Sequence, residues 1–143
     1  MIIAISADSI LARVYAQTAL NYTMSPSSRP PLCADSSDAL REIARSAAAE
    51  LSIIMLPIID DIDLYSPDDP EMISFMISEI CTINPIELRL LIEQIIVTIL
   101  LAQAYSEANP EASATYTLQA EKAKHRLRAL IAPASTLAIT PYP

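Results

Sequence analysis

Apolar residues recur at spacings of three and four over most of the chain, and this periodicity predicts helices. Helix start signals stand before each periodic stretch: a Ser, Asp or Asn cap, in several cases followed by proline and an acidic residue. Prolines or proline-rich segments separate most of the stretches. We therefore predict five helices, over residues 7–21, 36–56, 66–82, 84–108 and 109–132, with the last one ended by Pro133.

The helix over 84–108 differs from the others because it is apolar on nearly all sides. Its polar stripe is narrow and consists of Glu87, Gln94 and Thr98. A helix of this kind is buried by neighbours on most of its surface. The predicted fold class is therefore all-α: a five-helix bundle in one domain, with this fourth helix at its centre. Residues 1–6 and 133–143 are expected to be extended segments at the two ends.

The segment over 58–70 is rich in aspartate and holds two prolines, so we predict an exposed loop. Its acids could bind a hard cation through oxygen, but their spacing lacks the glycine and terminal glutamate of an EF-hand loop. The Glu-x-x-His pairs of a carboxylate di-metal bundle are also missing. No metal and no cofactor is expected. The aspartates in question are Asp60, Asp61, Asp63, Asp68 and Asp69.

The chain of 143 residues contains no glycine, which excludes sites built on glycine loops, such as the P-loop, the dinucleotide fingerprint and the nucleophile elbow. The only histidine, His125, stands between Lys124 and Arg126, whose charges oppose its protonation. We therefore predict that the protein is not an enzyme. The two cysteines, Cys33 and Cys81, are expected to be free thiols in a reducing compartment.

The charge balance and the hydropathy pattern exclude two further classes of partner. Seventeen acidic and nine basic residues give a net charge of −8, which disfavours binding to a phosphate backbone. No stretch approaches the roughly 20 apolar residues of a membrane span. The first residues have no basic region typical of a signal peptide. We expect no specific nucleic-acid binding and no membrane partner.

The charges are segregated along the chain. Residues 60–71 carry six acids and no base, whereas a basic stretch follows in the last predicted helix. The bases either match the dipole at a helix C-terminus or form a contact patch for an acidic partner, and both interpretations stay open. The second one predicts a head-to-tail contact between acidic and basic stretches of neighbouring copies. The basic residues are Lys122, Lys124, Arg126 and Arg128.

Both ends are compatible with extended segments that dock on another chain. Residues 2–5 are apolar and strand-like, and the tail from residue 134 cannot continue as a helix beyond Pro141. An extended segment with free backbone groups gains most when it adds to another chain's sheet edge. In the tail, the candidate contact residues are Leu137, Ile139 and Tyr142.

The stretches DALREIARSAAAELSIIMLP (38–57) and YTLQAEKAKHRLRALIAP (116–133), with a proline-rich early loop and an apolar helix between them, carry a family resemblance. Over 35–133 the chain resembles the head–tail connector (adaptor) proteins of tailed bacteriophages. The resemblance implies an assembly protein without an active site. Its copies would form a ring between portal and tail in the virion.

Two alternatives from other classes stay open. One is a small enzyme or ligand-binding protein with a pocket between the helices over 84–108 and 109–132, around Gln103, Tyr105 and Tyr116. The other is a regulatory protein whose acidic loop binds one basic partner. Both of these would be cytoplasmic. The mass of the protein in solution separates a ring from a monomer with a closed pocket.

Overall fold

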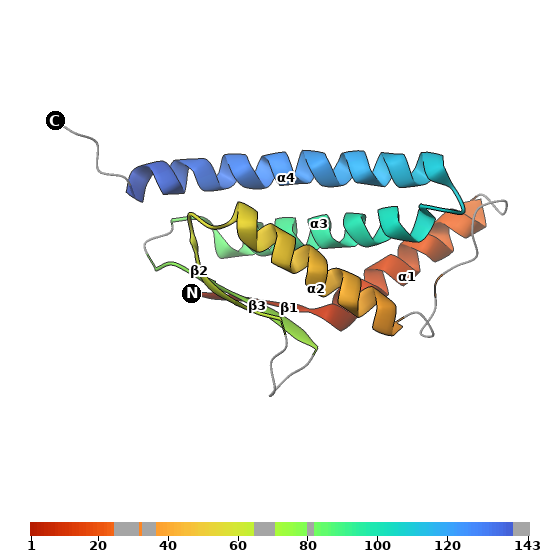
Figure 1. Ribbon diagram of the computed structural model, residues 1–143, viewed down its shortest axis with the longest axis horizontal. Helices are drawn as coiled ribbons and strands as arrows, with labels where there is room; N and C mark the ends of the chain where they lie inside the picture. The colour runs from red at the N-terminus through yellow and green to blue at the C-terminus, as the bar shows by residue number, and fades with distance from the viewer. Residues whose placement is uncertain (25–31, 33–36, 65–70, 80–81, 139–143) are drawn as a thin grey trace.

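A computed structural model describes residues 1–24, 32, 37–64, 71–79 and 82–138, with side chains as far as residue 132 (Figure 1). Within these residues the chain forms four helices and a three-stranded antiparallel sheet, so the predicted all-α five-helix bundle is wrong. The elements in chain order are β1 (Ile2–Ser6), α1 (Ala7–Met24), α2 (Ser37–Ile54), β2 (Ile59–Asp63), β3 (Met72–Ile77), α3 (Pro85–Tyr105) and α4 (Pro110–Ala138).

The central strand β3 lies where the sequence pattern predicted a helix over 66–82. Its side chains alternate: Ile73, Phe75 and Ile77 are buried, while Ser74 and Met76 face the opposite side. Because five of its six residues are apolar, the stretch fits the period of a helix and that of a strand equally well. Isoleucine and phenylalanine are enriched in strands, and pairing on both sides makes the strand the stable form.

Part of the predicted acidic loop is a strand as well. β2 pairs antiparallel with β3 from Ile59 to Asp63, with an irregularity in register between Ile59 and Asp61. Ile59 and Ile62 are half-buried, whereas Asp60 and Asp61 are exposed. β2 is an edge strand because the sheet order is β1-β3-β2, so its aspartates stay in water while its backbone bonds to β3.

The two ends of the chain also differ from their predicted form. Residues 2–5 were expected to dock on another chain, but they belong to β1, which pairs with β3 of the same chain from Ile2↔Met76 to Ser6↔Met72. At the other end, α4 continues past Pro133 to Ala138. Proline removes one helical hydrogen bond, and the residues on both sides continue the helix. Residues 139–143 lie outside the described residues.

The elements stack in layers, with α3 in the middle. The helices α2 and α3 lie over one face of the sheet, α1 runs on from the end of β1 and packs against α3 and α2, and α4 lies on the side of α3 away from the sheet (Figure 1). α3 therefore buries side chains around its circumference, and it begins at Asn84, whose side chain accepts hydrogen bonds from the amides of Ile86 and Glu87. Its fully buried residues are Leu88, Ile92, Ile95, Ile96 and Leu100.

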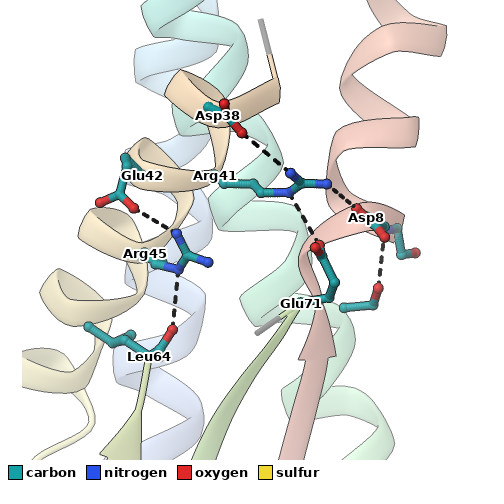
Figure 2. A network of polar contacts seen from close by, with 9 residues as sticks. Asp8, Asp38, Arg41, Glu42, Arg45, Leu64 and Glu71 are labelled. Carbon is teal, nitrogen blue, oxygen red and sulfur yellow. Dashed lines mark hydrogen bonds and ion pairs between the residues drawn. The ribbon is translucent and has the colours of Figure 1, made fainter. Parts of the chain in front are cut away.

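An ion-pair network fixes α2 to the sheet and to α1 (Figure 2). The Arg41 guanidinium donates to Asp8 at 2.8 Å and lies 3.2 Å from Glu71, so it joins the start of α1 to the start of β3. The amide of Ala7 donates to the Glu71 carbonyl at 2.7 Å in the same place. The hydrogen bond from Arg41 holds the pKa of Asp8 below its ordinary value of 3.8.

One turn further along α2, Arg45 makes a second link to the sheet (Figure 2). It pairs with Glu42 of its own helix at 2.7 Å and donates to the carbonyl of Leu64, just after β2, at 3.2 Å. Arg41 and Arg45 together hold one helix to both strands of the β2–β3 hairpin, at the same end of it, because Leu64 follows β2 and Glu71 precedes β3. The orientation of α2 on the sheet is therefore set by directional contacts as well as by apolar packing.

The central position of α3 predicts a large difference between two substitutions on this helix. Ile95 is 0% exposed and Leu90 is 53% exposed. Ile95→Ala removes buried methyl groups and leaves a cavity, so it should lower the free energy of unfolding by about 2–5 kcal/mol. Leu90→Ala should cost much less. Urea denaturation of both variants measures the difference, and equal costs would contradict the placement of α3.

Candidate functional site

The outer edge of β1 is the first candidate for a functional surface. The Ile77 amide donates to the Met1 carbonyl and the Ala7 amide donates to the Glu71 carbonyl, so odd-numbered residues of this segment face β3. In an antiparallel pair the intervening residues direct their N–H and C=O groups to the other side. The backbone groups of Ile2 and Ala4 therefore point away from the sheet, and no strand in the described chain pairs with them.

The two edges of the sheet differ in how well they are protected against pairing with another chain. β2 carries three aspartates and an irregularity in register, two features with which natural edge strands avoid unwanted pairing. β1 has the sequence Ile-Ile-Ala-Ile-Ser, with no charge and no proline. Under the same principle it is a ready template for a further strand. Only one edge of this sheet is therefore open to strand addition.

The outer face of the sheet, opposite the helices, adds apolar surface next to this edge. Ile2 and Met76 are register partners on this face and are 63% and 42% exposed. Ala4 lies opposite Ser74 in the next row. Asp61 is the partner of Met76 on the other side and bounds the patch with a negative charge. The apolar surface thus lies toward β1 and away from β2.

The structure places the acidic site residues of the sequence analysis on the β2 edge. Asp60 and Asp61 are exposed there, and Asp63 is half-buried at the end of the strand. Asp68 and Asp69 lie outside the described residues. Glu71, which belongs to the same acidic stretch, is paired with Arg41 inside the chain.

The basic site residues lie on α4, in the layer farthest from the sheet (Figure 1). Lys122, Arg126 and Arg128 are exposed, as is His125 between them. No hydrogen bond or ion pair of the described residues involves His125. Leu137 lies in the last turn of α4, where side chains are not described, and Ile139 and Tyr142 lie beyond the described residues.

Lys124 differs from the other bases because its side chain turns into the protein and is only 9% exposed. Its ammonium donates to Glu50 of α2 at 2.9 Å and to Glu121 at 3.3 Å. Burial acts to lower the pKa of Lys124, but the hydrogen bonds and charges of the two carboxylates outweigh it and raise the pKa above 10.5. Lys124 therefore ties α4 to α2 rather than facing a partner.

The second candidate site is a groove at the far end of α1. It holds Tyr105 and Tyr116, whose rings stack with centroids 5.8 Å apart and planes 16° from parallel. Asn21 of α1, which the sequence analysis did not single out, contacts both hydroxyls. Gln103 lies on another face of α3, in a hollow shared with Glu50 and Lys124. The structure therefore brings together two of the three residues expected to line a pocket.

Comparison with known proteins found no matching family model, no similar curated protein and no similar solved structure. None of the described helices is long and apolar enough to cross a membrane. In the same part of the chain, no three His, Cys, Asp or Glu side chains converge in a way that could hold a metal ion. The function must therefore be argued from the geometry of this chain.

The Lys124 cluster predicts a specific dependence of stability on alkaline pH. Since folding raises the pKa of Lys124, its stabilising effect is complete below about pH 10.5 and is lost as the pH rises through the folded-state value. Lys124→Met should therefore lower Tm near neutral pH, and the gap between parent and variant should narrow above pH 10.5. Thermal melts over this range provide the measurement.

Lys122→Met is the matched control for this experiment, because Lys122 is exposed on the same helix. It removes the same charge without breaking the pairs with Glu50 and Glu121. A gap that stays constant to the most alkaline pH would contradict the role assigned to the lysine charge.

Proposed function

We propose that this protein works by self-association, as an assembly protein whose copies pair through the outer edge of β1. The proposal rests on the contrast between the two sheet edges. β2 carries three aspartates and an irregularity in register, whereas β1 is apolar and its outer backbone groups pair with no strand of the described chain. Strand addition to an open edge satisfies backbone groups directly, so it needs no pocket and no charged patch. The partner to which we commit is a second copy of the same chain.

The backbone defines how two copies would pair. Ile2 and Ala4 supply the outward N–H and C=O groups, while the Ser6 carbonyl stands at the start of α1, where it accepts the first helical bond. In the antiparallel register that places Ile2 opposite Ala4 of the second copy, all four outward groups of each strand are bonded. The two sheets then join into one continuous six-stranded sheet.

Side chains agree with this register. Residues opposite each other share a face, so Ile3 meets Ile3 of the second copy on the side of the helices and extends the buried layer. On the outer face Ile2 meets Ala4, and no charge of β1 is brought near its own copy. Pairing through β2 would instead juxtapose aspartates in a chain whose net charge is −8.

This contact has two-fold symmetry and closes as a dimer, because the same strand is used by both copies. The narrower assignment to a connector subunit of a tailed phage requires a ring, which needs a second, head-to-tail contact. The segregation of acids on β2 and bases on α4 supports such a contact, although Lys124 and Glu71 are already paired within the chain. The ring stays a separate prediction.

The test of the edge contact compares two substitutions at one position. Ala4→Pro removes the outward N–H and leaves the bonds to β3 intact, which is tolerated on an edge strand. Ala4→Thr keeps the N–H and suits a strand. Sedimentation should find the parent and Ala4→Thr as dimers and Ala4→Pro as a monomer, with circular dichroism checking that each variant is folded.

Should Ala4→Pro fail to fold, Ile2→Lys takes its place, since this residue is 63% exposed and an edge lysine blocks pairing. The dimer should also persist in high salt, because its contact contains no charge. A charge-mediated ring would weaken as salt screens it, and reversal of Arg128 would break it. A parent chain that is a monomer at every concentration would overturn the proposed function.

A further inference from the structure

The groove beside the stacked tyrosines has the size and chemistry of a small-molecule site. It has a volume of about 370 Å³, within the range of known ligand pockets. The end of α1, which contributes Asn21 and Met24, lies beside the α3–α4 connection (Figure 1). The groove lies away from the sheet and does not depend on the assembly proposed above. The described residues that line it are all uncharged: Asn21, Met24, Tyr105, Asn109, Ala112, Thr115, Tyr116 and Gln119.

The hydrogen bonds around Asn21 identify which polar groups of this groove donate and which accept. The Asn21 amide nitrogen donates to the Tyr105 hydroxyl at 3.0 Å and to the Tyr116 hydroxyl at 2.8 Å. Its oxygen accepts from Gln17 at 2.9 Å, which holds the amide in this orientation. Each tyrosine hydroxyl therefore acts as an acceptor here and keeps its own proton.

The proton of the Tyr116 hydroxyl is the donor that this wall of the groove offers. No hydrogen bond within the described residues uses the proton of either tyrosine hydroxyl. Tyr105 is 1% exposed, whereas Tyr116 is half-buried and borders the groove. An oxygen of a bound molecule would therefore complete the hydrogen bonding of the Tyr116 hydroxyl.

Acceptors lie on the same wall. The Thr115 hydroxyl donates to the Glu111 carbonyl at 3.0 Å, so its lone pairs are free to accept. Gln119, one turn further along α4, is exposed and adds an amide oxygen. The groove thus offers a donor at Tyr116 and acceptors at Thr115 and Gln119, all three on α4. A molecule that matches both carries a C=O beside an N–H.

From this arrangement we infer that the groove between Asn21, Tyr105, Tyr116 and Thr115 binds a small, uncharged, planar carboxamide. The carbonyl oxygen accepts from the Tyr116 hydroxyl, and the amide N–H donates to Thr115. A carboxylate of the same shape is disfavoured, because none of the described lining residues is a cation that could pair with it and the chain carries a net charge of −8. Met24 and Ala112 supply apolar contact for the rest of the molecule.

Benzamide and benzoate are the probes, since they have nearly the same shape and differ in charge and in the N–H. Titration of the labelled protein, followed by amide chemical shifts, should show saturable binding of benzamide at millimolar concentration, with shifts at Asn21 and Thr115. Benzoate should bind at least tenfold more weakly. Equal binding of the two probes, shifts elsewhere only, or no saturable shift would overturn the inference.

Two matched pairs of variants test the hydrogen bonds themselves. Tyr116→Phe keeps the ring but removes one donor and should weaken benzamide binding about tenfold, whereas Tyr22→Phe, outside the groove, should leave it unchanged. Thr115→Val and Thr117→Val each remove a hydroxyl that donates to the carbonyl four residues earlier, and only Thr115 lines this groove. Unchanged affinity in both Tyr116→Phe and Thr115→Val would contradict the site.

Discussion

The pairing of β3 with two strands from distant parts of the chain is the constraint on which the rest of the structure depends. β1 and β2 do not pair with each other, so each is a strand only because β3 lies between them. One face of β3 lines the core and packs against the helices through three buried side chains, Ile73, Phe75 and Ile77. The Arg41 network then anchors α2 at Glu71, directly before this strand. To pair β1 with β3, the chain must close the long loop between these two strands, and this closure costs conformational entropy.

The helices could be predicted from the sequence because their signals are local. Ser6, Asn84 and Asn109 accept hydrogen bonds from amides two or three residues ahead, and each does so at the helix start that the sequence predicts. The strands could not be predicted in this way. MISFMI is nearly uniform in hydropathy, and Ile59–Asp63 is too acidic to read as a strand without its partner. What selects strand over helix or loop there is pairing across the chain, which no local pattern records.

The candidate sites show the same difference between what local sequence predicts and what long-range contacts decide. The exposure of Asp60, Asp61, Lys122, Arg126 and Arg128 could be anticipated, since charged residues seldom lose water. The burial of Lys124 could not, because it requires Glu50 from another helix to be opposite it. The open edge of β1 appears only when its partner is known, and the partnership of Asn21 with Tyr105 spans 84 residues of sequence. Residue type indicates what a side chain can do, whereas long-range packing decides which side chains meet.

One helix connects the two surfaces on which the proposals rest. α1 begins directly after β1, at the edge assigned to pairing, and Asn21 near its other end holds the two tyrosines. Ala7 and Asn21 are fourteen positions apart, which corresponds to about 21 Å of regular helix, and an α-helix transmits displacement along its axis with little internal change. A ligand that pulled on Asn21 would therefore have to shift α1 as a whole to reach β1. That shift is opposed at the start of the helix, where Asp8 is bonded to Arg41 and Ala7 to Glu71, and along its buried face by Ile10 and Val14. For this reason we expect weak coupling between the groove and the edge, and the proposed binding and the proposed association should be independent of each other.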